Sequence, residues 1–234
     1  MTTPSTPGVA LVTGAASGIG ASVAADLSDR GWRVAGLDLR PSQWDISRVV
    51  DVSDADGVAS AAADVESQLG AIDAVVSAAG HYAMVEVGDI SQQQWHAMLR
   101  VHLGGLLNLS RAVLPGMTAR GSGSIVAITS ELAIGGGDGD AHYASAKGAV
   151  IGLVRSLAIE VAHTGVRVNG VAPGPTDTPL IGPDSPWRAP AYLSTLPLRR
   201  LVAPEEVAHT VAFVIEEGGF MTGEILSPNA GAVI

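Results

Sequence analysis

Short apolar runs alternate with longer amphipathic runs along most of the chain. Short runs rich in Val, Ile and Ala are typical of buried strands, whereas the longer runs repeat their apolar positions at helical spacing. The predicted strands are Val9–Thr13, Arg33–Asp38, Val49–Asp51, Ile72–Ser77, Ser124–Thr129, Val166–Val171 and Glu224–Leu226. The predicted helices lie near Gly18–Arg30, Asp54–Leu69, Ser91–Ala119, Tyr143–His163 and Pro204–Glu216.

Strands that alternate with helices predict βαβ units and therefore a parallel sheet. We expect an α/β fold of the Rossmann type, with a doubly wound parallel sheet of seven strands flanked by helices. No linker, repeat or change of composition divides residues 1–234, so we expect a single domain. The stretch Asp38–Val49 is too short for a crossover helix and predicts a bare loop. Residues 174–200 hold six prolines and predict an irregular flap over the carboxyl edge of the sheet.

Composition and charge favour a globular protein with a large core and argue against several other classes of protein. Hydrophobic residues make up 47% of the 234 positions, enough for a large core. A net charge of −10 without a Lys/Arg cluster argues against nucleic-acid binding, and the lack of cysteine excludes disulfides and zinc–thiolate sites. Met1–Gly8 has no basic start followed by an apolar run, and Gly8–Ala25 is too rich in Gly, Ser and Thr for a membrane span. We expect a cytoplasmic protein that binds neither membranes nor nucleic acid.

A glycine-rich turn follows the first predicted strand directly. It reads Thr13-Gly-Ala-Ala-Ser-Gly-Ile-Gly20 and leads into the first predicted helix. Glycines allow the backbone to turn sharply and to approach a pyrophosphate, and the helix start offers free N–H groups to the phosphates. The turn therefore predicts a dinucleotide site that includes Gly14, Ser17, Gly18, Ile19 and Gly20.

Asp38 ends the second predicted strand, 24 residues after Gly14. A carboxylate there can accept hydrogen bonds from the adenosine ribose hydroxyls and would repel a 2′-phosphate, which favours NAD over NADP. Arg40 is the one nearby cation that could approach such a phosphate. Asp51 ends the third predicted strand and Val52 follows it, and both are candidate cofactor contacts. Asp51 could bond the adenine amino group, although a solvated turn residue explains it nearly as well.

Lys147 is the only lysine beside 12 arginines, and it lies four residues after Tyr143. Residues at this spacing share one face of a helix. A compact ammonium near a phenol favours the phenolate, so we expect Lys147 to lower the pKa of Tyr143 from about 10 toward the working pH. Tyr143 could then remove a proton from an alcohol or donate one to a ketone, and Lys147 could also bond the nicotinamide ribose.

On these residues the chain resembles the short-chain dehydrogenases/reductases. The T-G-x-x-x-G-I-G motif of that family matches residues 13–20, and its Y-x-x-x-K motif matches Tyr143 and Lys147. The family serine, 13 residues before the tyrosine, matches Ser130. The resemblance extends from Val9 to Gly231. It implies an NAD(H)-dependent oxidoreductase that transfers a hydride between nicotinamide and a secondary alcohol or ketone, with Ser130 orienting the substrate oxygen.

The resemblance also implies further contacts to the cofactor. Thr176, through its backbone, and Thr178 would hold the nicotinamide carboxamide. Pro173 and Gly174 would turn the chain beneath the ring, and Ala79 and Gly80 would line the cleft. Relatives in the family are commonly tetramers, which implies a homotetramer here, with a dimer as the alternative.

The sequence departs from the family pattern in two places. The usual N-N-A-G after the fourth strand is Ser77-Ala78-Ala79-Gly80, and the usual asparagine of the long fourth helix is replaced by His102. That asparagine helps to hold a water that relays protons to the lysine. Because histidine donates, accepts and titrates near neutrality, one hypothesis is that His102 keeps the relay; the alternative, of equal weight, is that the role is lost.

The substrate is the least determined part of the prediction. Glu131 and His142, beside the candidate serine and tyrosine, are candidate substrate contacts. We interpret the segment Asp138-Gly-Asp140-Ala-His142 as a loop bordering the substrate rather than as a metal site, and we expect no catalytic metal. Alternative functions are a 3-oxoacyl-thioester (acyl-carrier-protein) reductase, a dihydrodiol-type dehydrogenase, and, as a minor alternative, a non-catalytic nucleotide-binding sensor.

Overall fold

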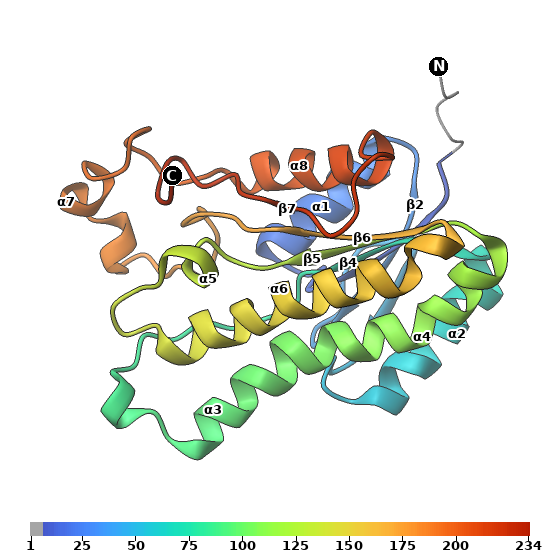
Figure 1. The fold of residues 1–234 in the computed structure, drawn as a ribbon, viewed down its shortest axis with the longest axis horizontal. Helices are drawn as coiled ribbons and strands as arrows, with labels where there is room; N and C mark the ends of the chain where they lie inside the picture. Colours follow the sequence, from blue (N-terminus) through green and yellow to red (C-terminus); the bar gives the residue numbers. More distant parts are fainter. Residues whose placement is uncertain (1–6) are drawn as a thin grey trace.

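The computed structural model describes residues 7–234, and its centre is a parallel sheet of seven strands (Figure 1). The strands are β1 (Val9–Thr13), β2 (Arg33–Asp38), β3 (Ile46–Val49), β4 (Ile72–Ser77), β5 (Gly123–Ile128), β6 (Val166–Val171) and β7 (Ile225–Leu226). They are ordered β3-β2-β1-β4-β5-β6-β7, and each neighbouring pair is parallel. The predicted fold class is confirmed.

Helices cover both faces of this sheet (Figure 1). The α-helices are α1 (Gly18–Asp29), α2 (Ala55–Leu69), α3 (Gln92–Leu99), α4 (Gly105–Arg120), α5 (Leu132–Gly135), α6 (Ala141–Val161), α7 (Pro190–Leu193) and α8 (Pro204–Glu216). Short 3-10 turns are η1 (Val87–Asp89), η3 (Ala162–Thr164) and η4 (Pro186–Arg188), and η2 (Arg100–Gly104) is a π-helix.

The two faces of the sheet carry separate hydrophobic clusters. In β1, Val9 and Leu11 pack with residues of α2, α4 and α6, whereas Ala10 and Val12 pack with residues of α1 and α8. Every residue of β1 is buried, as expected for a parallel strand covered on both sides. The sequences of such strands are continuous apolar runs, which is why the positions of the strands could be predicted from the sequence.

Two predicted elements differ from the structure by more than a shift of one or two residues at their ends. The third strand spans Ile46–Val49 rather than Val49–Asp51, because Ile46 is buried and pairs with Ala35, while Asp51 accepts a hydrogen bond from the Ser53 amide at 2.8 Å. The long helix predicted over residues 91–119 is interrupted by the π-helix η2, which contains His102. Such π-helical turns occur mostly as bulges inside α-helices and are frequent at functional sites.

The predicted loop between β2 and β3 and the predicted irregular flap over residues 174–200 agree with the structure. No helix connects β2 to β3, and residues 174–200 contain only the short elements η4 and α7. Most of the stretch Met1–Gly8, considered above for a leader, lies outside the described residues. Among the residues that the structure describes, no helix is both long enough and apolar enough to cross a membrane.

The order of the strands leaves a crevice at one edge of the sheet. From β1 the chain passes through α1 to β2, whereas from β4 it passes through α3 and α4 to β5, on the opposite side. In doubly wound sheets ligands bind outside the carboxyl ends of the strands at such a reversal. The residues after β1 and β4 are therefore the place to look for a site.

Candidate active site

The turn after β1 depends on glycine for its shape. Gly14 and Gly18 have positive φ angles of 69° and 57°, a region that side chains with a Cβ atom rarely adopt. A Cβ atom on Gly20 would collide with the carbonyl oxygen of Gly14. The hydroxyl of Thr13 accepts hydrogen bonds from the Ala78 and Ala79 amides at 3.0 and 3.1 Å, and so joins the end of β1 to the end of β4.

The start of α1 opens onto a cleft. Its N-cap residue, Ser17, makes no side-chain hydrogen bond to the first turn, so the positive end of this helix is not capped by its own chain. We call this cavity the glycine-side cleft; its lining comprises Gly14, Ser17, Gly18, Ile19, Gly20, Asp38, Leu39, Arg40, Val50, Asp51, Val52, Ala78, Ala79, Gly80, His81, Val101, Thr178, Pro179 and Leu180. An uncapped helix start beside glycines fits a pyrophosphate.

An acid and a base lie together in the glycine-side cleft. The Asp38 carboxylate accepts hydrogen bonds from the amides of Ala16 at 3.1 Å and Arg40 at 3.0 Å. The mostly exposed Arg40 guanidinium donates to the Ser17 hydroxyl at 3.0 Å. Asp38 is thus held by the backbone, whereas the mostly exposed Arg40 guanidinium is held by the Ser17 hydroxyl and by an ion pair with Asp38 at 3.9 Å.

A second cavity, the tyrosine-side cleft, adjoins the first. Both are lined by Ile19, Ala78, Gly80, Thr178 and Leu180, so the two clefts are continuous. The remaining lining of the tyrosine-side cleft comprises Tyr82, His102, Ile128, Thr129, Ser130, Glu131, Leu132, Tyr143, Lys147, Pro173, Gly174, Pro175, Thr176, Ile181 and Trp187.

Lys147 is buried beneath Tyr143 on α6. Its Nζ atom donates to the Ile128 carbonyl at 2.7 Å and lies 5.7 Å from the centroid of the Tyr143 ring. Burial lowers the pKa of Lys147 to about 7, so a large fraction of the amine is neutral at neutral pH.

The expected lowering of the tyrosine pKa is wrong for the chain by itself. Burial, together with the negative charge of Glu131, raises the pKa of Tyr143, and a hydrogen bond with Ser130 opposes this only in part. The physical reason is that removing a phenolate from water is costly and that the nearby Glu131 carboxylate repels its charge. A lowered pKa would need a further positive charge near the phenol.

Ser130 and Glu131 form a buried pair at the end of β5. The Ser130 hydroxyl donates to the Glu131 Oε2 atom at 3.0 Å and accepts from the Leu132 amide at 3.2 Å. Burial raises the pKa of Glu131 to about 7, although the hydrogen bond from Ser130 acts in the opposite direction. The carboxyl is therefore poised between its neutral and charged forms near neutrality.

His102 connects η2 to the loop after β4. Its Nε2 atom lies 2.9 Å from the His81 carbonyl oxygen, and its ring meets the Tyr143 ring edge-on at 5.5 Å between centroids. Its Nδ1 atom is buried and has no partner among the described residues. Gly80 packs against this ring, and a Cβ atom there would collide with it. Burial and the charge of Lys147 lower the pKa of His102, which favours the neutral ring.

The structure brings almost all predicted site residues to these two clefts. Ser130, Tyr143, Lys147, His102 and Glu131 line the tyrosine-side cleft, and each predicted cofactor residue lines one cleft or both. The exception is His142, which is buried and does not line either cleft.

Tyr82 and Trp187, which line the tyrosine-side cleft, were missed, as was their connection to Asp140, which does not line it. The Tyr82 hydroxyl donates to Asp140 at 2.8 Å and accepts from the Trp187 indole at 3.2 Å. Asp140 was read above only as part of a loop, and the sequence carries no signal that joins it to the other two. Tyr82, two residues after Gly80, was the one available hint.

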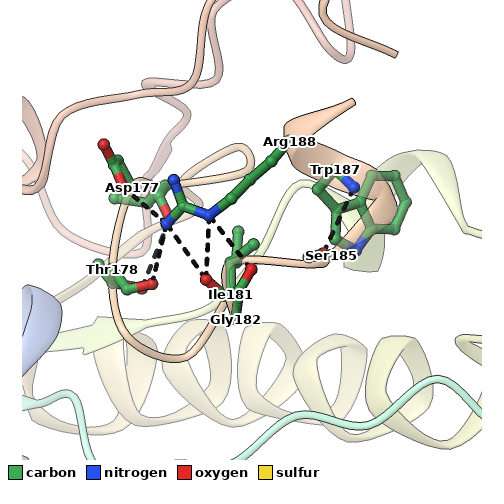
Figure 2. Close-up of polar contacts among 8 residues, drawn as sticks. Asp177, Thr178, Ile181, Gly182, Ser185, Trp187 and Arg188 are labelled. Atoms are coloured by element: carbon green, nitrogen blue, oxygen red, sulfur yellow. Dashed lines mark hydrogen bonds and ion pairs between the residues drawn. The ribbon is translucent and has the colours of Figure 1, made fainter. Parts of the chain in front are cut away.

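Arg188 fixes the flap that carries Trp187. Figure 2 shows its guanidinium directed toward Asp177 and the neighbouring backbone carbonyls. It pairs with the Asp177 carboxylate at 2.6 Å and donates to the carbonyls of Thr178, Ile181 and Gly182. This one side chain ties both ends of the loop 177–188 together and so places the tryptophan over the cleft.

Known proteins match nearly the whole chain. The family model described as Enoyl-(Acyl carrier protein) reductase matches residues 14–232. Cis-4-hydroxycyclohexanecarboxylate dehydrogenase of Sinomonas cyclohexanicum is 35% identical and the alignment covers 95% of both chains. 3-Oxoacyl-(acyl-carrier-protein) reductase FabG of Thermotoga maritima is 32% identical, with 97% of this chain and 98% of that protein covered. The ligand-free aldohexose dehydrogenase of Thermoplasma acidophilum has a similar structure, with a TM-score of 0.89, 30% identity, and coverage of 96% and 93%.

Proposed function

The chain belongs to the short-chain dehydrogenase/reductase family, and we propose that it is an NAD(H)-dependent enzyme that interconverts secondary alcohols and ketones. The family and the oxidoreductase class rest on the matches over nearly the full length. The choice of NAD, the roles of individual residues and the substrate are our proposals.

One observation carries the proposal. Ser130, Tyr143 and Lys147 come from two elements, the end of β5 and α6, yet they line one cleft, which continues into the cleft at the glycine turn. A substrate held beside the tyrosine would therefore lie next to the reactive end of a dinucleotide that follows the glycine turn. A pocket that holds a substrate next to the reactive end of a dinucleotide suits hydride transfer.

Asp38 supports NAD rather than NADP. Its carboxylate is held by two backbone amides at the outer end of the glycine-side cleft, where it can accept hydrogen bonds from ribose hydroxyls. A 2′-phosphate in the same place would meet this negative charge. Arg40 could compensate only by giving up its hydrogen bond to Ser17.

The protein residues would orient the substrate and move its proton. The nicotinamide ring, when bound, supplies or accepts the hydride. The Tyr143 hydroxyl would donate a proton to the carbonyl oxygen in reduction, and the phenolate would take the alcohol proton in oxidation. Ser130 would donate a hydrogen bond to the same oxygen. Lys147, held by the Ile128 carbonyl, would place positive charge beneath the phenol.

We propose that His102 positions the loop after β4, and that its free Nδ1 atom holds a water of the proton relay. The support is its contact with the His81 carbonyl and the buried, unpartnered state of Nδ1. A histidine at this place keeps an acceptor or donor where the family uses an amide.

The test is a panel of secondary alcohols and ketones followed by NADH absorbance, with NADP(H) in parallel. We expect turnover of at least one ring alcohol, and higher kcat/KM with NAD than with NADP. If no alcohol or ketone is turned over and nucleotide binding is unaffected by Tyr143→Phe, the chain acts as a nucleotide sensor instead.

A second candidate is reduction of 3-oxoacyl thioesters. Relatives named 3-oxoacyl-(acyl-carrier-protein) reductase and acetoacetyl-CoA reductase match over 94–97% of this chain. Acetoacetyl-CoA with NADPH and with NADH separates this function from the first, and a dihydrodiol in the panel tests the dihydrodiol-type alternative.

We also propose that the enzyme works in the cytoplasm as a homotetramer, with α4 and α6 between subunits. The support is the family resemblance, together with exposed apolar residues on both helices: Leu107 on α4 is 40% exposed and Ile159 on α6 is 83% exposed. Sedimentation or light scattering distinguishes a tetramer from a dimer.

A further inference from the structure

The Glu131 carboxyl lies beside the proposed reacting groups but has no part in the mechanism above. The residue lines the tyrosine-side cleft, is only 5% exposed, and its amide donates to the Pro173 carbonyl at 3.1 Å. The Ser130 hydroxyl donates to its Oε2 atom at 3.0 Å. A substrate oxygen that contacts the Ser130 hydroxyl would therefore lie within two hydrogen-bond lengths, about 6 Å, of this carboxyl oxygen.

Negative charge dominates this end of the cleft. Burial raises the pKa of Glu131 to about 7, while hydrogen bonds from Ser130 and from the backbone favour the charged form. Burial and then the charge of Glu131 raise the pKa of two phenols, Tyr143 on α6 and Tyr192 on α7. Asp140, directly before α6, is a second carboxyl whose charge repels that of Glu131. A substrate would therefore react in a negative field.

Among the described residues that line the cleft, no permanently charged cation offsets this field. Lys147 is the one lysine or arginine there; its Nζ atom donates to the Ile128 carbonyl, and burial lowers its pKa to about 7. Burial and the charge of Lys147 keep His102 neutral by lowering its pKa. In the flap, Arg188 is engaged by Asp177 and by backbone carbonyls (Figure 2). A carboxylate on the substrate would thus meet like charge without a partner, which is unfavourable in a buried site.

Building on the proposed function, we propose that Glu131 excludes substrates that carry a carboxylate within two carbons of the reacting carbon. The substrates are then neutral at this end. They are simple ketones or 3-oxo esters and thioesters, with the corresponding alcohols, and not free 2- or 3-oxo acids. The apolar side chains of Ile128, Leu132, Leu180 and Ile181 line the same cleft and suit such neutral groups. The exclusion is electrostatic, and the hydride and the proton move as described above.

The exclusion depends on pH because the carboxyl titrates. Above pH 7 Glu131 is mostly charged and repels a carboxylate, whereas below pH 7 it is mostly protonated. Lys147 acts in the same direction, since it is mostly charged only below its own pKa of about 7. Tyr143 and Tyr192 stay protonated over this range because their pKa values are raised. Asp140 also has a raised pKa, so replacing Glu131 alone is needed to isolate its charge.

The experiment compares methyl acetoacetate with acetoacetate, which differ at this end mainly in charge. The loss of NADH absorbance gives kcat/KM for each at pH 6 and pH 8.5. Reduction is chosen because the nicotinamide ring of NADH is uncharged, whereas the positive ring of the oxidised cofactor would offset a carboxylate. The proteins are the wild type, Glu131→Gln and the control Glu86→Gln, an exposed residue outside both clefts.

The ratio of kcat/KM for the ester to that for the acid is the measured quantity, because effects of pH or of a variant on the chemical step cancel in it. For two charges several ångströms apart near a protein surface, we expect the wild type to prefer the ester by about 10- to 100-fold at pH 8.5. The preference should be smaller at pH 6. In Glu131→Gln the ratio at pH 8.5 should fall toward the wild-type ratio at pH 6, and Glu86→Gln should behave like the wild type.

Three results overturn this inference and leave the proposed function intact. They are equal kcat/KM for acid and ester in the wild type at pH 8.5, an undiminished preference in Glu131→Gln, and turnover of other alcohols or ketones without turnover of the ester. If Glu131→Gln is inactive with both compounds, the wild type decides, because a ratio that does not change between pH 6 and pH 8.5 also overturns the inference. No turnover of any alcohol or ketone overturns the proposed function as well.

Discussion

The two clefts that meet at the carboxyl edge of the sheet are built in different ways. The glycine-side cleft is formed by backbone: positive φ angles at Gly14 and Gly18, an uncapped helix start, and a carboxylate held by amides. The tyrosine-side cleft is formed by desolvated side chains, with Glu131 and Lys147 both at pKa values of about 7. We propose that the glycine-side cleft binds the cofactor through its backbone shape and that the tyrosine-side cleft carries the reaction through its desolvated, titratable side chains.

Replacing the phenol should separate the two clefts most clearly. Tyr143→Phe removes the hydroxyl that we propose as the proton donor but keeps the ring and its contacts with Tyr82 and His102. Because positioned acid–base groups contribute about 10²- to 10⁴-fold, we expect kcat to fall by that factor. NADH fluorescence titration should give an unchanged Kd. A parallel loss of nucleotide affinity would show that the clefts are not independent.

The reverse experiment changes only the glycine-side cleft. In Asp38→Ser the carboxylate is lost and Arg40 stays beside Ser17, so NADP should be accepted more readily. We expect the ratio of kcat/KM for NAD to that for NADP to fall by about 10- to 100-fold, the range of hydrogen bonds to charged groups. Asp51→Ser is the matched control, since Asp51 lines the same cleft and any adenine contact is common to both cofactors.

The same difference explains what could be predicted from the sequence. The glycine turn, Asp38 and the Tyr143–Lys147 pair depend on neighbours a few residues away or on strand ends, so local patterns predict where they lie. Trp187 and Tyr82, which form a hydrogen bond, are 105 positions apart in the sequence, and no local sequence pattern predicts a contact at that separation. Protonation states were also out of reach, because the pKa of Tyr143 depends on burial by the whole fold. The π-helix at His102 was not predicted either.

The flap allows a smaller test of the tyrosine-side cleft. Arg188→Ala removes the hydrogen bonds that tie residues 177–182 to η4 and should loosen Trp187 above the cleft. We expect KM for the alcohol to rise about tenfold, equivalent to about 1.4 kcal/mol, with little change in the Kd of NADH. Arg33→Ala, an exposed site at the start of β2, is the control. An equal rise in both variants would assign the effect to surface charge.

The smallest effect concerns stability, and it tests whether reactivity in the tyrosine-side cleft has an energetic cost. Folding raises the pKa of Glu131 from 4.5 to about 7, so between these pH values the folded chain keeps a proton that the unfolded chain has lost. Stability therefore falls as pH rises through this window, and the full cost is present above pH 7. Glu131→Gln removes it, and we expect a gain of roughly 1–3 kcal/mol at pH 8, or about 2–4 °C in Tm per kcal/mol. At pH 4.5 the gain should be much smaller, and exposed Glu86→Gln should show no such difference between the two pH values. The same gain at both would mean that packing, and not the buried charge, sets the stability of this cleft.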